Sequence, residues 1–312
     1  MDVAERGEPI LAIEGLRKEF GRLAALKGID LVLDGPGVYG FLGPNGAGKT
    51  TTFKCVCALL RPTGGRVRVG GADVQRDTSE AMAKIGVQFD APAFYPYLSG
   101  SENLLVFSKW VGGDCERSIP ELLALVGLAE AGRKKVAAYS WGMKQRLGLA
   151  SALLADPRLV LMDEPTNGLD PAGIADMRSL LPRLAGERGM AVLLSSHRMD
   201  EVEQVCDRVI IIHRGEIVAD GAPRALAALE SLIEIRCADP LRAVEALRER
   251  GDIASIERAG ADTVRLLGSR ATTGEVNRFL VERGILVEQV LEKRESLEEI
   301  FFRLTGTGDG RG

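Results

Sequence analysis

The sequence Gly43-Pro-Asn-Gly-Ala-Gly-Lys-Thr50 decides the fold, because it matches the pattern G-x-x-x-x-G-K-[ST] of loops that wrap nucleotide phosphates. The apolar run at 38–42 predicts a short buried strand before this loop, and residues 49–60 predict a helix after it. The three glycines of the loop allow positive φ and a close approach of the backbone to phosphate. The N–H groups of the loop and the positive end of the helix then face the anion.

Two side chains of the loop have expected roles of their own. Lys49 would reach the β- and γ-phosphate oxygens, and the Thr50 hydroxyl would ligate Mg²⁺. The sequence therefore predicts a site for a nucleoside triphosphate and Mg²⁺. The residues expected to contact the nucleotide are Gly43, Pro44, Asn45, Gly46, Ala47, Gly48, Lys49, Thr50 and Thr51.

Composition limits the function classes. A chain of 312 residues suggests one large domain or two, and a net charge of −4 argues against a broad nucleic-acid surface. The five cysteines are scattered, and Cys55 and Cys57 are better explained as packing thiols than as metal ligands. No apolar run reaches the roughly 18 residues needed to span a bilayer. A membrane role would therefore require a separate membrane partner.

Two regions of secondary structure are expected between residues 8 and 225. Short apolar runs alternate with helical stretches from Ile10 to Ala219, which predicts a mainly parallel sheet with helices on its faces. Its expected buried strands include 159–162, 191–194 and 209–212. The runs at 11–13, 29–32 and 66–69 predict an antiparallel edge layer, and about 92–145 predicts an inserted helical subdomain.

Past about Gly221 the pattern changes. Strands and helices in the order β-α-β-β-α-β predict a small α+β module at about 228–305. Thr272 and Glu275 form an expected capping box at the start of a helix, and Ser296 is expected to cap the last helix. The tail at 306–312 is expected to be disordered.

The run Leu159-Val-Leu-Met-Asp163-Glu164 predicts a buried strand that ends in two carboxylates. Asp163 is placed to hold Mg²⁺ opposite Thr50, directly or through water. Glu164 could polarise an attacking water, as a general base must. The phosphate loop and the continuation Pro165-Thr-Asn-Gly-Leu-Asp170 support this interpretation of the two carboxylates.

The run Tyr139-Ser-Trp-Gly-Met-Lys-Gln-Arg146 precedes a long helix, and Ser140 is a plausible N-cap of it. This run resembles the signature sequence of ATP-binding cassette (ABC) ATPases, in the form typical of their drug- and antibiotic-export branch. The resemblance covers about residues 8–225. It implies the P-loop α/β cassette fold, ATP as the nucleotide, and a dimer in which Ser140 and Gly142 contact the γ-phosphate of ATP held by the opposite subunit.

The same resemblance gives roles to four further residues. Phe20 is similar to the aromatic residue that stacks on adenine, although a Phe at a strand end could also belong to the core. Asp170 resembles the loop that links the two active sites, and His197 the switch histidine near the γ-phosphate. The family usually has Gln as its Mg²⁺ sensor, where this chain has Asp90. Gln88 lies two residues earlier.

The resemblance also implies partners. The stretch at 93–98, followed by 102–104, resembles the region that receives a coupling helix from a membrane subunit, although its aromatics could instead form subdomain core. The implied assembly is a homodimer, or a heterodimer with a related cassette. It would bind a separate polytopic permease at the cytoplasmic face of the membrane, with no nucleic acid.

Two other classes of function compete with a transport ATPase. A soluble ABC ATPase acting on ribosomes or nucleic acid would carry two cassettes or long coiled coils, and this chain has one cassette and no heptad run. A kinase or GTPase with a phosphate loop would not explain the stretch from Tyr139 to Arg146. The sequence also lacks an Asn-Lys-x-Asp base-reading motif.

Overall fold

The computed structural model describes residues 8–89, 93–112, 115–228, 232–269, 271–293 and 297–305. The chain divides into two compact units, Met1–Asp220 and Gly221–Gly312. The sequence placed the start of the second module slightly later, at about residue 228. Each unit is described by itself.

The first unit is built on a six-stranded sheet with the order β10-β9-β3-β8-β7-β6. Every residue of β3 and β8 is buried, as expected for central strands covered on both faces. The pairs β3–β8, β3–β9, β7–β8 and β6–β7 are all parallel, which confirms the predicted mainly parallel sheet. The strands are β3 (Gly37–Leu42), β6 (Ile85–Gln88), β7 (Leu159–Asp163), β8 (Ala191–Ser196), β9 (Arg208–His213) and β10 (Glu216–Gly221).

The register of the sheet brings three chain segments to one edge. Leu42 pairs with Ser196, and Asp163 pairs with Ser195. Parallel strands that end in register place the segments after them side by side, which is where α/β proteins bind ligands. The phosphate loop after β3 therefore lies beside the residues that follow β7 and β8.

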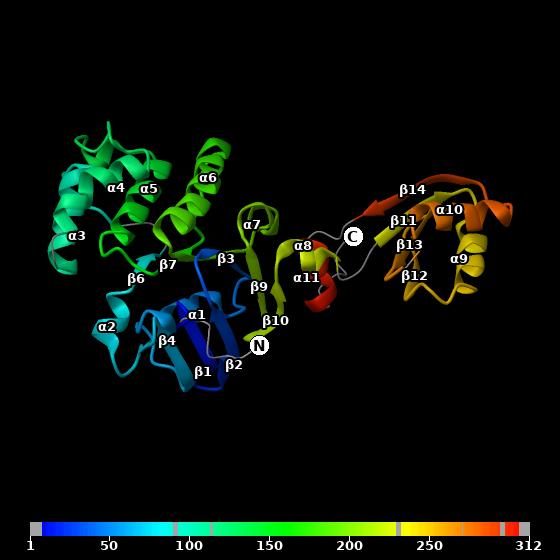
Figure 1. Ribbon diagram of the computed structural model, residues 1–312, viewed down its shortest axis with the longest axis horizontal. Coiled ribbons are helices and arrows are strands. Elements are labelled where there is room, and N and C mark those ends of the chain that lie inside the picture. The colour runs from blue at the N-terminus through cyan, green and yellow to red at the C-terminus, as the bar shows by residue number, and fades with distance from the viewer. Residues whose placement is uncertain are drawn as a thin grey trace. The chain divides into compact units, whose positions relative to one another are not determined.

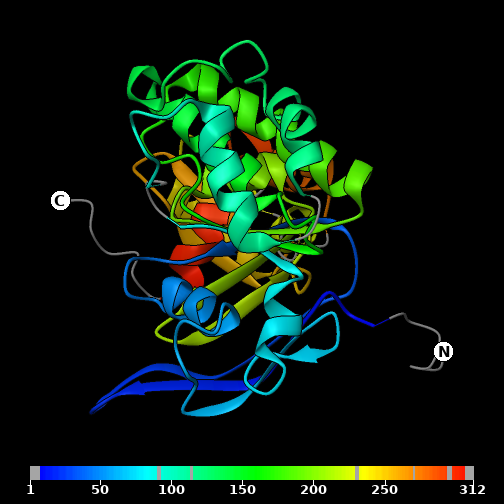
Figure 2. The same ribbon diagram turned by 90° about the vertical axis from the view of Figure 1, so that its left-hand side faces the viewer.

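A second, antiparallel sheet has the order β2-β1-β4-β5. The helix after the phosphate loop packs between the two sheets, where the rings of Phe41 and Phe53 are 6.0 Å apart. Figure 2 shows this layer below the core sheet and the helical region above it. The elements are β1 (Leu11–Phe20), β2 (Leu23–Leu33), β4 (Gly64–Val69), β5 (Ala72–Asp73), α1 (Lys49–Val56) and α2 (Thr78–Met82).

A helical region interrupts the core sheet between β6 and β7, where the sequence predicts an inserted subdomain. Its three α-helices gather at one end of the first unit (Figure 1). The helices are α3 (Gly100–Val111), α4 (Ile119–Leu125) and α5 (Trp141–Ala152), with short 3₁₀ turns at Cys115–Ser118 and Val136–Ala138. Two further helices, α6 (Pro171–Arg188) and α7 (Met199–Val205), follow β7 and β8.

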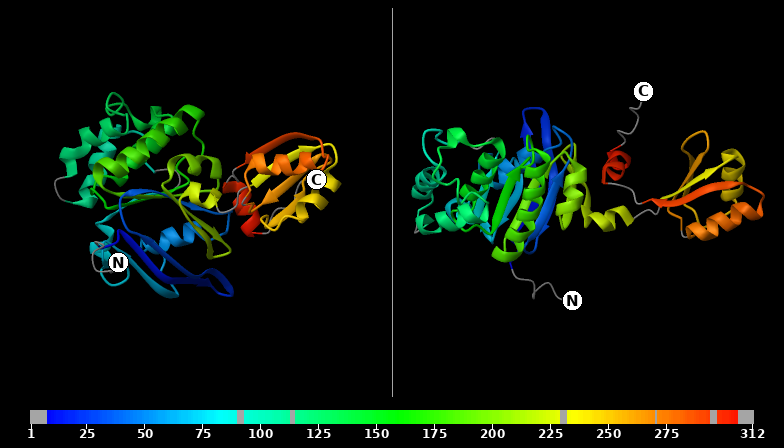
Figure 3. Two further views of the ribbon diagram at one scale, coloured as in Figure 1. Left: turned by 45° about the vertical axis from the view of Figure 1, so that its right-hand side comes forward. Right: turned by 90° about the horizontal axis from the view of Figure 1, so that it is seen from above.

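The second unit contains a four-stranded antiparallel sheet with the order β12-β13-β11-β14. Helices α9 and α10 pack against this sheet around a core that includes Ile235, Leu247 and Leu266 (Figure 3). The predicted capping box of Thr272 and Glu275 is present at the start of α10. The elements are α8 (Pro223–Ala228), β11 (Leu232–Cys237), α9 (Pro240–Arg248), β12 (Ser255–Arg258), β13 (Thr263–Leu267), α10 (Thr273–Glu282), β14 (Val287–Lys293) and α11 (Leu297–Thr305).

Two expectations for the C-terminal end fall outside the described residues. These are the N-cap at Ser296 and the disordered tail at 306–312. In the part of the chain that the structure describes, none of the helices combines the length and the apolar character needed to cross a bilayer.

The cysteines give a testable consequence of this packing. Burial raises the pKa of Cys55 to about 11 and that of Cys57 to about 12, and Cys206 and Cys237 are buried as well. Only the thiolate reacts with alkylating reagents. Because Cys115 alone is partly exposed, we expect iodoacetamide to label this single position in the native chain and all five cysteines after unfolding. Peptide mass spectrometry checks this, and rapid labelling of Cys55 would contradict the described packing.

Candidate nucleotide site

The phosphate loop joins β3 to α1 and depends on its glycines for two different reasons. Gly46 and Gly48 have φ values of 82° and 118°, which side-chain-bearing residues rarely adopt. Gly43 lies outside this left-handed region, so the prediction of a positive φ there is wrong. A Cβ at Gly43 would instead lie 2.3 Å from the carbonyl oxygen of Ile212, so close packing against β9 requires this glycine.

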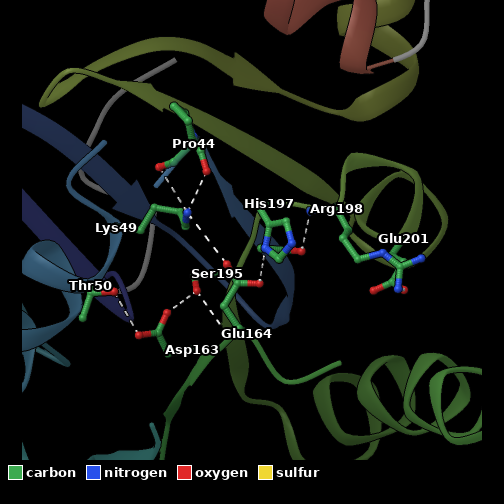
Figure 4. Close-up of polar contacts among 11 residues, drawn as sticks. Pro44, Lys49, Thr50, Asp163, Glu164, Ser195, His197, Arg198 and Glu201 are labelled. Carbon is green, nitrogen blue, oxygen red and sulfur yellow. Dashed lines mark hydrogen bonds and ion pairs between the residues drawn. The ribbon is translucent and has the colours of Figure 1, made fainter. Parts of the chain in front are cut away.

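Lys49 is folded back over the loop that precedes it. Its Nζ donates to the carbonyl oxygens of Gly43 at 2.6 Å and Pro44 at 3.4 Å, and lies 3.8 Å from Glu164 Oε1 (Figure 4). Only 6% of the side chain is exposed. Burial lowers the pKa of Lys49, and the charges of Glu164 and Asp163 oppose that shift. The ammonium is therefore held over the loop, where phosphate oxygens could replace its carbonyl acceptors.

Thr50 and Asp163 come together from different elements. The Thr50 hydroxyl donates to Asp163 Oδ2 at 3.0 Å, although the two residues are 113 positions apart in the sequence. A hydroxyl and a carboxylate in contact beside a phosphate loop are the oxygen donors that Mg²⁺ prefers. These residues fit the predicted magnesium site.

Glu164 adopts an unusual backbone conformation at the end of β7. Its φ of 50° lies in the left-handed region, which costs a non-glycine residue about 1–3 kcal/mol and is typical of functional sites. This conformation accompanies a carboxylate with two neighbours: Oε1 faces Lys49, and Oε2 lies 2.9 Å from His197 Nδ1. The structure thus brings together the expected general base and the expected switch histidine.

Ser195 is a residue of this site that the sequence reasoning did not include. Its hydroxyl donates to Asp163 Oδ1 and lies 3.2 Å from the backbone nitrogen of Glu164, which donates to it (Figure 4). One signal could have found it. A run of two serines ends an otherwise apolar strand just before His197.

Lys49, Thr50, Asp163 and Glu164 lie around a cavity that opens to solvent, whereas His197 and Ser195 do not line it. It is lined by Ala25, Pro44, Asn45, Gly46, Gly48, Lys49, Thr50, Thr51, Asp163, Glu164 and Asn167. Most of the predicted loop residues therefore face one space. Gly43 and Ala47 do not line the cavity. Ala25 and Asn167 do line it, although the sequence did not predict them there.

Phe20 lies at the end of β1, at the turn into β2. Its side chain is 45% exposed, and Lys18 Nζ lies 5.0 Å from the centre of the ring. The alternative interpretation, in which Phe20 belongs to the core, is therefore wrong. The ring does not line the cavity, so adenine stacking by Phe20 stays a prediction.

Ser140, Gly142 and Asp170 also lie outside the cavity lining. Ser140 caps α5 by accepting a hydrogen bond from Met143 N at 3.3 Å, and Asp170 caps α6 by accepting one from Gly173 N at 2.9 Å. The neighbouring Trp141 donates from Nε1 to the carbonyl oxygen of Asn167 at 2.9 Å. The signature stretch is thereby tied to the loop that follows Glu164 in the same chain.

The predicted Mg²⁺ sensor, Asp90, lies outside the described residues. Gln88, two positions earlier, is buried at the end of β6. Its Nε2 donates to the carbonyl oxygen of Gln145 in α5 at 3.2 Å, so this side chain connects the sheet to the signature helix.

Comparison with known proteins identifies the family. The model of the ABC transporter family matches residues 26–167. The bacitracin transport ATP-binding protein BcrA of Bacillus licheniformis is 37% identical over 300 residues, which cover 96% of this chain and 98% of that protein. The chain belongs to the ABC transporter ATP-binding proteins. It is an ATPase whose hydrolysis of ATP is coupled to transport.

Other members of the ABC family agree with this assignment. The daunorubicin resistance ATP-binding protein DrrA3 of Streptomyces coeruleorubidus is 36% identical over 311 residues, which cover 95% of this chain and 96% of that protein. The solved structure of the ATP-binding cassette MJ0796, a dimer bound to ADP and phosphate, has a TM-score of 0.60 at 25% identity. It covers 68% of this chain and 98% of that chain. The predicted family and cassette fold are confirmed.

Proposed function

We propose that this chain is the ATP-hydrolysing subunit of an exporter whose membrane-spanning subunits are a separate polypeptide. The observation that carries the direction of transport is the extent of the similarity to BcrA and DrrA3. It includes the C-terminal unit as well as the cassette, and both names refer to transport of, or resistance to, an antibiotic or drug. The chain would lie at the cytoplasmic face of the membrane as a peripheral subunit.

Binding of ATP would use the groups that already surround the cavity. The ammonium of Lys49 exchanges the carbonyls of Gly43 and Pro44 for oxygens of the β- and γ-phosphates. Thr50 and Asp163 would hold Mg²⁺, which neutralises charge on those phosphates when it is bound. Asp90 is the proposed third residue near the metal.

Hydrolysis would depend on Glu164 and His197. The Glu164 carboxylate would accept the proton of the attacking water, since it lines the cavity and lies 3.8 Å from the ammonium expected to hold the γ-phosphate. The water oxygen would bond to the γ-phosphorus as the bond from that phosphorus to the ADP oxygen breaks. His197 lies 2.9 Å from that carboxylate and would orient it. Its contact with the γ-phosphate would follow from the role of the switch histidine in the family. A carboxylate placed between an ammonium and an imidazole suits this role better than a structural one, since it is partly exposed and its backbone is strained.

The site of one chain would be completed by a second copy. Ser140 and Gly142 lie outside the cavity of their own chain, yet they begin a helix whose N-terminus favours anions. In a dimer they would face the γ-phosphate held by the partner, with Asp170 near the contact between the two sites. The dimeric form of MJ0796 with ADP and phosphate supports this arrangement. ATP then closes the dimer, and hydrolysis reopens it.

The permease would bind the helical region at its exposed aromatic side chains. The side chains of Tyr97 and Trp110 are 65% and 75% exposed, and the Trp110 ring lies 5.9 Å from that of the partly buried Phe107. The loop that carries Tyr97 is hydrogen-bonded to α3 through Tyr95 and Asn103. Asn103 accepts from Tyr95 N at 2.8 Å and donates to its carbonyl oxygen at 3.1 Å. Large aromatics held open to solvent are typical of protein-binding sites.

A substitution at this surface tests the proposal. We expect Tyr97→Asp combined with Trp110→Asp to reduce recovery of a polytopic membrane protein by about tenfold or more, because a charge is placed in an apolar contact. The ATPase rate of the isolated chain should be unchanged. The measurement is mass spectrometry of the protein co-purified from detergent-solubilised membranes.

The control is Leu59→Asp, which places one such carboxylate at a side chain that is 62% exposed outside the helical region. It should leave recovery of the partner intact. If the native chain sediments with ribosomes or nucleic acid and no membrane protein is recovered, the exporter assignment is wrong.

A further inference from the structure

Ser195 occupies a position between the two carboxylate-bearing residues of the site. It pairs with Asp163 in the parallel register of β7 and β8, and none of its surface is exposed. A buried hydroxyl costs free energy unless it is hydrogen-bonded. The other residues of β8 up to this point, 191–194, are apolar, so the packing of the strand does not itself require a hydroxyl here.

The Ser195 hydroxyl makes two hydrogen bonds of opposite sense. It donates to Asp163 Oδ1, and it accepts from the backbone nitrogen of Glu164 at 3.2 Å. A hydroxyl has one donor and two acceptor lone pairs, so it can make both bonds at once. One side chain thus contacts the residue expected to hold the metal and the residue expected to act as the base.

Each bond has a geometric consequence. With Oδ1 of Asp163 engaged by Ser195, Oδ2 is left facing Thr50 at 3.0 Å. The Glu164 nitrogen also donates to the Ser195 carbonyl oxygen at 3.2 Å, so both acceptors of Ser195 hold the residue whose φ is 50°. A strained backbone persists only where its surroundings fix it.

We propose that Ser195 is a positioning residue for ATP hydrolysis, which fixes the metal-facing carboxylate of Asp163 and the strained backbone of Glu164 through one hydroxyl. The proposal rests on the assignment of Asp163 to Mg²⁺ and of Glu164 to the base in the proposed function. Mutation of a residue that hydrogen-bonds to a metal ligand and orients it typically lowers metal affinity or activity by about 10–100-fold.

The test compares Ser195→Thr with Ser195→Val. The two replacements have nearly the same shape and add the same volume, but only Thr keeps a hydroxyl. At saturating Mg²⁺, we expect Ser195→Val to lower kcat by about 10–100-fold relative to Ser195→Thr, with little change in KM for ATP. In an equilibrium titration with a fluorescent ATP analogue, Ser195→Val should also need about tenfold more Mg²⁺ to reach half-maximal enhancement of binding.

Ser195→Ala adds no volume and repeats the test if the larger side chains prevent folding. The matched control is Ser196→Ala. The Ser196 hydroxyl is also buried but accepts from Arg198 N rather than contacting a carboxylate, so the Mg²⁺ titration should not change. The proposal is overturned if Thr and Val behave alike at position 195 and Ala behaves like the native serine in both measurements.

Asp163→Asn distinguishes a failure of the magnesium assignment from a failure of the Ser195 proposal. It should raise the Mg²⁺ concentration needed for half-maximal enhancement of ATP-analogue binding more than Ser195→Val does. If Asp163→Asn leaves the titration unchanged, the magnesium assignment fails. If Asp163→Asn has its effect while Thr and Val at position 195 remain indistinguishable, the positioning role of Ser195 fails alone.

Discussion

Replacing Glu164 by Gln is expected to lower the rate of ATP hydrolysis by about 100-fold or more, because an amide cannot accept the proton of the attacking water. Gln has nearly the same shape as Glu and can keep a hydrogen bond to His197. The change removes a negative charge 3.8 Å from Lys49, so ATP affinity should be unchanged or higher. Phosphate release gives the rate, and equilibrium binding of ATP gives the affinity.

Glu216→Gln is the matched control for this substitution. Glu216 also pairs with a lysine, at 3.3 Å from Lys27 Nζ, but it does not line the cavity. Its replacement should leave the rate unchanged. Hydrolysis by Glu164→Gln at the native rate would show that another group takes the proton.

Replacing Ser140 by Arg is expected to lower turnover by about 100-fold or more while the ATP affinity of the separate chain changes little, since this is the size of effect that follows when a group stabilising developing charge is lost. Ser140 is exposed and lies outside its own cavity, so a longer side chain is accommodated in the monomer. The loss would arise only where the helix terminus meets the γ-phosphate of another chain. Steady-state ATPase and equilibrium ATP binding separate the two effects.

Loss of the helix cap must be distinguished from the blocked contact. Ser140→Ala removes only the bond to Met143 N, which should cost about 1 kcal/mol of stability and leave room for the partner. Thr272→Arg removes a comparable cap in the C-terminal unit and should leave the ATPase rate unchanged. An equal fall in ATP affinity and turnover in Ser140→Arg would argue against action across a dimer.

The core of the fold could be predicted because its strands are buried on both faces. Continuous apolar runs such as 159–162 and 191–194 identify such strands directly. Polar residues at their ends, Asp163 and His197, then mark the edge of the sheet where the site forms. The phosphate loop supplied the third segment, so most of the cavity lining followed from the sequence.

The residues that were missed depend on register and packing. Ser195 reaches the site because the pairing of β7 with β8 places it opposite Asp163. The two strands are separated in the chain by α6, so the sequence does not show this pairing. The contact between Trp141 and Asn167 depends on how the helical region meets the core. The positive φ predicted for Gly43 was wrong. The sequence pattern identifies the glycine, but it does not show the Ile212 carbonyl oxygen that leaves no room for a side chain there.

Contacts between chains are a separate matter. Within one chain, Ser140 and Asp170 have a complete local explanation as helix caps. Nothing in their own hydrogen bonds requires a second copy. Their proposed roles come from the family, from the position of both residues outside the cavity, and from the dimer of a related cassette.

In the proposed mechanism, ATP joins two copies of this chain through the phosphate loop of one and the Ser140 helix terminus of the other. Light scattering of Glu164→Gln with and without Mg²⁺ and ATP tests it most directly. We expect the monomer mass of 33.5 kDa without nucleotide and twice that mass with it. Once Ser140→Arg is added, we expect the monomer mass in both conditions. A monomer mass for Glu164→Gln with ATP demonstrably bound would contradict this mechanism.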